Sequence, residues 1–190
     1  MKMRMHMGNG SMVSSMLLEG HCDLGISAYP VIDSRLKSEL IYTSRLLPIA
    51  SPQVVARFTL ASDFALAIRS EPLLAYNLEL SLVDSWLQKN QISIEGLVPA
   101  TVGQDLRAQR KSLSQGVGWS VMPEFLCKEH ILSGQLMEIP SPVGTHDIQY
   151  FLIWLPSALR HVRVAHARQA LLSPLVGFFD GSSSFCLFPK

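Results

Sequence analysis

Three short motifs contain residue types that carry out catalysis or bind nucleotides in other proteins. Ser120 lies in a Gly-Trp-Ser-Val-Met string that lacks the last glycine of a nucleophile elbow and falls inside a predicted strand. Residues 34–37 match S-x-x-K, but the companion motifs of the serine enzymes that use it are missing. Gly8-Asn9-Gly10 continues to Val13, where a dinucleotide-binding fingerprint needs glycine. None of the three motifs predicts a reaction.

Metal-binding residues are equally sparse. His161 and His166 are five positions apart on a predicted helix, so they diverge where a zinc-binding pair needs a separation of four. Cys22, Cys127 and Cys186 are widely spaced and form no C-x-x-C pair, so we expect buried free thiols. The sequence therefore predicts no catalytic residue, no metal site and no cofactor.

Composition argues against two further classes of protein. Charged residues make up 16% of the 190 residues and the net charge is +1, without the basic surplus of a nucleic-acid-binding domain. The longest apolar runs, such as residues 150–155, are far shorter than the roughly 20 residues that span a bilayer. Residues 1–7 alternate methionine with cations, unlike a secretory signal, so a cytoplasmic location is expected.

The chain alternates short apolar strands with helices. Strands are expected over residues 2–7, 22–27, 36–50, 73–76, 98–102, 119–122, 136–139 and 148–155. Helices are expected from Ser11 to Gly20, over 61–68, from Ser81, over 106–115, from Pro123 to Gly134, and over 158–172. The clearest stretch is 113–125, where a helix stops at Gly116, a buried strand follows and Pro123 starts the next helix. This pattern, with a shorter copy at 16–26, suggests a two-lobed α/β receptor.

Several segments keep an order and spacing that is specific as a set. They are residues 18–26, 40–42, 48–52, 72–76, 105–107, 116–124, 133–136 and 147–152, of which 116–124 is the strongest. Together they cover nearly all of residues 3–172 and resemble the effector-binding domain of LysR-type transcriptional regulators. That domain shares the fold of type 2 periplasmic binding proteins.

The resemblance implies an α/β, two-lobed, type 2 periplasmic-binding-protein-like fold that is incomplete at the N-terminus. Family members begin with a winged helix-turn-helix and then a strand and helix, both missing here, so a truncated form is expected. Lobe I is expected to comprise 1–72 and 145–172, and lobe II 73–144. Residues 173–190 are expected to form a poorly ordered tail.

In this fold, small ligands sit between the lobes and contact loops at the ends of strands. Carried over by position, the ligand-binding residues are Gly8, Asn9, Gly10, Ser27, Ala28, Val102, Gly103 and Gln104. Glycine at 103 lets the backbone approach a ligand closely, and N–H groups at Gln104 and Asp105 would favour a carboxylate. The expected ligand is therefore a small organic acid, although alanine at 28 provides no cation to bind it.

Two of these features have a plainer interpretation. Gly8-Asn9-Gly10 is also typical of a simple turn. Arg107, Arg110 and Lys111 lie on one predicted helix and either lend positive potential to the site or form a solvated face. Both alternatives stay open at this point.

The resemblance implies a non-catalytic sensor in which a small effector shifts the relative position of two lobes. DNA is then contacted only through the missing DNA-binding domain, no membrane is involved, and the protein is expected to be a homo-oligomer. The alternatives are the solute-binding protein of a transporter, which the lack of a secretory signal disfavours, and an enzyme on the same two-lobed fold.

Overall fold

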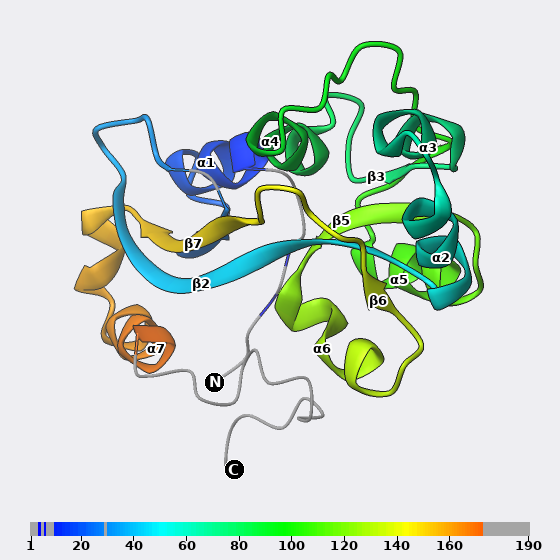
Figure 1. The fold of residues 1–190 in the computed structure, drawn as a ribbon. Helices are drawn as coiled ribbons and strands as arrows, with labels where there is room; N and C mark the ends of the chain where they lie inside the picture. The colour runs from blue at the N-terminus through cyan, green and yellow to red at the C-terminus, as the bar shows by residue number, and fades with distance from the viewer. Residues whose placement is uncertain (1–3, 5, 7–9, 29, 173–190) are drawn as a thin grey trace. The chain divides into compact units, whose positions relative to one another are not determined.

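The computed structural model describes residues 4, 6, 10–28 and 30–172, and these residues divide into two compact units (Figure 1). Unit 1 contains the described residues up to Thr43 and those from Ile148 onward, and unit 2 contains Ser44–Asp147. The chain therefore passes between the units twice, once within β2 (Lys37–Ala50) and once within β7 (His146–Trp154). The predicted strand at 2–7 and the predicted tail at 173–190 lie largely or wholly outside the described residues. The predicted lobe boundaries stay a prediction.

Unit 1 is built on a sheet in which β7 lies between β1 (Leu24–Ser27) and β2. β7 runs antiparallel to β1, with Gly25 opposite Ile153. This inner place suits its apolar sequence, as predicted for 148–155. α1 (Gly10–Leu18) packs on β1, and a Cβ added at Gly25 would lie 2.5 Å from Cγ1 of Val13. Glycine at this position is therefore what lets the helix approach the strand.

The end of unit 1 is a 3-10 turn, η1 (Pro156–Arg160), followed by α7 (Val162–Leu172), where a single helix over 158–172 is expected. Arg168 of α7 pairs with Glu39 of β2 at 2.6 Å. Its guanidinium also lies 4.3 Å from the centre of the Trp154 ring, which ends β7. One cation thus ties α7 to two strands.

Unit 2 contains the rest of β2 and two small sheet regions. β2 pairs antiparallel with β5 (Trp119–Pro123) and β6 (Met137–Glu138), while β3 (Leu74–Ala75) and β4 (Thr101–Val102) form a parallel pair. Its helices are α2 (Pro52–Leu60), α3 (Phe64–Ser70), α4 (Ser81–Lys89), α5 (Leu106–Ser114) and α6 (Glu124–Leu132). One cluster of its core consists of Leu47, Ile49, Leu74, Leu113, Met122, Cys127 and Leu136.

A second part of the core of unit 2 is aromatic. The rings of Trp86 and Trp119 have centroids 5.9 Å apart, and Phe64 and Phe58 pack edge-on against them. Both tryptophans are fully buried, and both indole N–H groups find acceptors. Trp119 donates to the Ile68 carbonyl at 3.2 Å and Trp86 donates to the Ser141 hydroxyl at 2.9 Å. The cluster fixes α3, α4 and β5 to one another.

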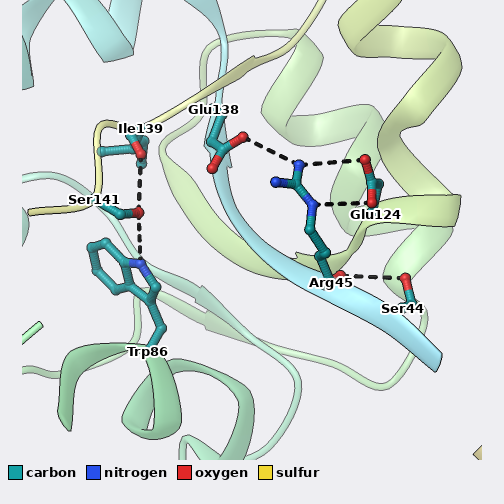
Figure 2. Close-up of polar contacts among 7 residues, drawn as sticks. All are labelled: Ser44, Arg45, Trp86, Glu124, Glu138, Ile139 and Ser141. Atoms are coloured by element: carbon teal, nitrogen blue, oxygen red, sulfur yellow. Dashed lines mark hydrogen bonds and ion pairs between the residues drawn. The ribbon is translucent and has the colours of Figure 1, made fainter. Parts of the chain in front are cut away.

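The first passage between the units is followed at once by a charged anchor. Arg45 of β2 donates through Nε to Glu124 of α6 at 3.2 Å, and its Nη2 lies 3.7 Å from a carboxylate oxygen of Glu138 in β6 (Figure 2). The hydrogen bond to Glu124 raises the pKa of Arg45 above its usual value. Because all three side chains are partly exposed, this network orients β2 more than it stabilises the fold.

Several expectations from the sequence need correction. α2 is missing from the predicted elements, which include no helix between the strand expected over 36–50 and the helix expected over 61–68. In the structure β2 continues through Pro48, and Ser51 with Pro52 forms a helix start with proline in the first turn. Ser11 lies inside α1, which begins at Gly10, and Ser81 is the first residue of α4, whose N-cap is Leu80.

Gly118 allows a close backbone contact with Pro72 in unit 2. A Cβ at this position would lie 2.0 Å from the Pro72 carbonyl oxygen, whereas one at Gly134, also at positive φ, would meet nothing within 4 Å. We expect Gly118→Ala to lower the free energy of unfolding by about 3 kcal/mol or more. Gly134→Ala is the control and should cost about 1 kcal/mol. Urea denaturation measures both, and equal losses would contradict the contact.

Cys127 is buried in α6, and this burial raises the pKa of its thiol to about 12. The reactive thiolate is therefore nearly absent at a pH of about 8. We expect iodoacetamide to modify the half-buried Cys22 well before Cys127 in the native chain, and Cys127 to react once urea unfolds it. Peptide mass spectrometry follows the two sites, and equal native labelling would show that Cys127 is accessible.

Candidate functional site

Three of the predicted ligand residues, Val102, Gly103 and Gln104, lie where the chain leaves the parallel β3–β4 pair of unit 2. Ala75 pairs with Val102, the last residue of β4, so the chain leaves both strands at the same edge. The Gly103 N–H donates to the Ala75 carbonyl at 3.0 Å, which holds the next turn of chain against β3. We name residues 76–77 and 102–105 the β3–β4 edge. Val102 and Gln104 are exposed there and Gly103 is half-buried.

Gln109 of α5 fixes this edge from beneath. Its Nε2 donates to the Ala75 and Gly103 carbonyls, each at 2.7 Å, and its side chain is buried. Its Oε1 is buried without a hydrogen-bond partner among the described residues. One amide group therefore joins the end of β3 to the turn after β4. The unpaired Oε1 costs free energy, and the two hydrogen bonds of Nε2 offset part of that cost.

Sequence reasoning missed Gln109, although a signal for it exists. Leu106 and Leu113 of α5 pack in the core of unit 2 at helical spacing, and position 109 lies on the same face of the helix. A polar side chain at an apolar position of a helix indicates a buried hydrogen-bonding role. The neighbouring Arg110 is also partly buried and donates to the Leu126 carbonyl of α6, so it belongs to the packing of α5 and not to a solvated face.

The start of α5 already contains a carboxylate. Asp105 is the N-cap, and its Oδ1 accepts from the N–H groups of Arg107 at 3.0 Å and Ala108 at 3.1 Å. The chain's own carboxylate thus fills the place where a ligand carboxylate would meet these first-turn amides. Any anionic group at this edge would also meet the negative charge of Asp105.

The remaining predicted residues belong to unit 1. Gly10 is the first residue of α1, and its carbonyl accepts from the Ser14 hydroxyl at 3.2 Å. Ser27 ends β1 opposite Phe151 and is buried, and Ala28 follows half-buried. Gly8 and Asn9 lie outside the described residues. That these positions form one site with Val102, Gly103 and Gln104 stays a prediction.

A separate hollow of about 330 Å³ lies within unit 2. It is lined by residues at the start of α2 and at the ends of α5 and α6, namely Ser51, Pro52, Gln53, Ser114, Gln115, Gly116, Gly134 and Gln135. None of the predicted ligand residues lines it. This hollow is an alternative place for a ligand, against which the predicted site has to be tested.

The described ranges, residues 4, 6, 10–28 and 30–172, contain neither a metal-binding cluster nor a membrane-spanning helix. There, no three side chains of His, Cys, Asp or Glu are grouped so that they could hold a metal ion. In the same part of the chain, no helix combines the length and apolar character needed to cross a bilayer.

The comparisons define the family. The model of the LysR substrate binding domain matches residues 1–174, so the chain belongs to this family. A search of the curated proteins gives no match. The observed α/β architecture is accordingly the two-lobed, periplasmic-binding-protein-like fold of LysR regulatory domains, as the resemblance implies.

Solved structures agree on the fold. The C-terminal domains of a LysR family protein from Agrobacterium tumefaciens give a TM-score of 0.72 at 20% identity, over 87% of this chain and 78% of that one. The regulatory domain of CrgA from Neisseria meningitidis gives 0.65 at 16%, over 83% and 77%. Full-length LysG from Corynebacterium glutamicum with bound effector Arg gives 0.67 at 16%, over 90% of this chain but only 57% of that one. The chain thus spans little more than half of the full-length relative.

The role of Gln109 in shaping the β3–β4 edge can be tested by a matched pair of variants. Gln109→Leu keeps the size of the side chain but leaves the Gly103 carbonyl without its donor, so we expect a loss of about 1–3 kcal/mol in the free energy of unfolding. Gln104→Leu changes an exposed side chain and should cost less than about 0.5 kcal/mol. Urea denaturation of both gives the comparison. A Gln109→Leu variant as stable as Gln104→Leu would mean that the two hydrogen bonds do not fix the edge.

Proposed function

We propose that this chain is the effector-sensing part of a LysR-type transcriptional regulator. The observation that supports this most is the family match over residues 1–174, together with a fold shared by several regulatory domains. In this proposal the domain is non-catalytic, and a small organic molecule shifts its conformational equilibrium by binding one form better than the other. The family match favours this role over that of a transporter's solute-binding protein or an enzyme.

The proposal extends to the setting of the domain. DNA is contacted through a DNA-binding domain outside the matched region, not through this domain, whose net charge of +1 gives it no basic surplus. The regulator works in the cytoplasm as a homo-oligomer. A domain of this kind needs no resident cofactor, because its signal is the ligand itself.

We place the effector at the β3–β4 edge, in contact with Val102, Gly103 and Gln104. Here the backbone is open at a glycine, and Gln109 holds it in place from the buried side. The residues of unit 1, Gly8, Asn9, Gly10, Ser27 and Ala28, stay predicted contacts.

The chemical class of the effector is narrowed by the charge at this edge. A small organic acid is the predicted class, but Asp105 already occupies the first-turn amides of α5. The acid would therefore need other donors, whereas an amino acid could offer its ammonium group to Asp105. The solved structure of LysG contains arginine as its effector, so both classes belong in a screen.

A substitution at Gly103 separates ligand binding from folding. Its φ is not in the left-handed region, and an added Cβ would meet only Gln109 Nε2 at an ordinary 3.9 Å. Gly103→Val should therefore keep the fold but block close approach, and lower the affinity of any bound acid or amino acid by about tenfold or more. Ala100→Val, an exposed change just before β4, is the control. Isothermal titration calorimetry measures the ligand affinity of both variants. An unchanged affinity in Gly103→Val would show that the effector does not bind at this edge.

The sensing role itself is tested by a thermal-shift screen of the purified chain. The panel contains mono- and dicarboxylic acids and the natural amino acids, L-arginine included. A binder present at about 100 times its Kd should stabilise the folded state by about 2.7 kcal/mol and raise the Tm visibly. Conversion of a stabilising compound into a product would instead support an enzyme. If no compound in the panel shifts the Tm, an effector of these classes is ruled out.

A further inference from the structure

The first residue of α4, Ser81, is hydrogen-bonded to Asn77 of the β3–β4 edge. Asn77 lies two positions after β3, and its Oδ1 accepts from the Ser81 N–H at 3.1 Å. Its Nδ2 donates to the Ser81 hydroxyl at 2.7 Å. Asn77 therefore takes over the task of an N-cap side chain, because Leu80 at the cap position has none to offer.

The other end of α4 holds residues 141–145, which we call the return segment because the chain leaves unit 2 shortly after it. Asn90 is only 5% exposed. Its Nδ2 donates to the carbonyls of Trp86 at 2.8 Å and Gly144 at 2.9 Å, and its Oδ1 accepts from the N–H groups of Val143 at 2.8 Å and Gly144 at 3.3 Å. The hydrogen-bonding capacity of this amide is thus used in full, two donors and two acceptor positions.

Two further side chains of α4 contact the return segment. The Trp86 indole N–H donates to the Ser141 hydroxyl, which in turn donates to the Ile139 carbonyl at 3.5 Å (Figure 2). Lys89 Nζ donates to the Thr145 carbonyl. The sequence pattern around Pro140 and Pro142 is typical of a loose linker, yet the segment is bonded to one helix at Ser141, Val143, Gly144 and Thr145.

The helix between these two ends is well supported. Val83, Trp86 and Leu87 are almost fully buried, and Trp86 packs in the aromatic cluster with Trp119. A packed helix of only nine residues moves as one rigid unit. A displacement of its N-terminal end is therefore expected to move its C-terminal end as well.

The backbone on either side of α4 is strained. Leu80 and Gln91 are the non-glycine residues with positive φ among those described, at 53° and 58°. Leu80 is a bulky residue for which this conformation costs about 1–2 kcal/mol, so surrounding contacts must hold it. Strained residues of this kind are concentrated at sites with a functional role.

We propose that α4 couples the β3–β4 edge to the return segment, with Asn77 and Asn90 as the positioning residues at its two ends. The return segment ends at residue 145, just before β7, and the chain passes into unit 1 within β7, between Asp147 and Ile148. This inference rests on the proposed function, because the event reported from the edge is effector binding. It names the route by which that event would reach the passage between the units.

The test uses amide hydrogen exchange of the full chain without any ligand, measured by NMR. Asn77→Ala removes both hydrogen bonds to Ser81, far from the return segment in sequence. We expect the amides of Val143 and Gly144 to exchange roughly fivefold faster in this variant, the effect of losing one helix cap. By reciprocity, Asn90→Ala should accelerate exchange of the Ser81 amide.

Ser51→Ala is the matched control, because it removes the cap of α2, a helix that belongs neither to the β3–β4 edge nor to α4. It should leave Val143 and Gly144 unchanged once exchange is corrected for global stability from urea denaturation. If Asn77→Ala does not fold, Asn77→Asp keeps the acceptor for the Ser81 amide and loses only the Nδ2 donor. Equal acceleration by the control, or exchange of Val143 within about twofold of wild type in the Asn77 variant, would overturn the coupling.

Because no ligand enters this experiment, its outcome is independent of the thermal-shift screen. If the exchange experiment shows coupling but the screen finds no binder, the linkage through α4 stands and the result counts against the sensing role. If the screen finds a binder but exchange shows no coupling, the sensing role stands and α4 is excluded as the route.

Discussion

The close backbone contact between Gly118 and Pro72 determines where β3 lies. It is possible only because position 118 has no side chain. It is completed by a hydrogen bond of 2.9 Å from the Trp119 N–H to the Pro72 carbonyl and one of 2.6 Å from the buried Ser120 hydroxyl to the Leu74 carbonyl. β3 has two residues and would not hold a position by itself. The neighbouring strand β5, which is paired with β2, holds β3 in position through these contacts.

Everything proposed for function begins from this placed strand. On one side β4 pairs with β3, and Gln109 then joins the end of β3 to the turn at Gly103. Along the chain, β3 leads directly to Asn77 and so to α4 and the return segment. The candidate ligand edge and the candidate route out of it therefore share one origin, and both are confined to unit 2. Both the proposed ligand contacts and the proposed route through α4 therefore depend on the position of the two-residue strand β3.

The sequence predicts those features that depend on local chemistry. The helix stop at Gly116 and the buried strand after it are confirmed, because glycine, proline and apolar spacing act over a few residues. Family membership, predicted from the order and spacing of several segments, is confirmed by the family model, which matches residues 1–174. α2 was missed because two prolines near a strand have two interpretations, and only the tertiary pairing of Pro48 with Val121 decides between them.

The candidate site was harder to predict than the fold. Gly103 is a predicted ligand contact because a glycine lets the backbone approach a ligand, and this stays a prediction. Asp105 was an available N-cap signal, and its consequence for the binding of an anion was overlooked. Gln109 stands out locally only as a polar residue on the apolar face of its helix, and the partners of Gln109 and Asn90 lie in segments 34 and 53 positions away, which no local pattern names. Both residues have a primary amide that is buried, Gln109 within α5 and Asn90 at the end of α4.

The central claim is that an effector binds where the chain leaves β3 and β4. The most direct measurement is the set of amide NMR shifts of the 190-residue chain titrated with carboxylic acids and amino acids. The account predicts that a binder moves the Gly103 and Gln104 resonances first and most. A binder that leaves these two resonances in place and moves those of Gln53, Gln115 and Gln135 would put the ligand in the hollow between α2, α5 and α6 and contradict the claim.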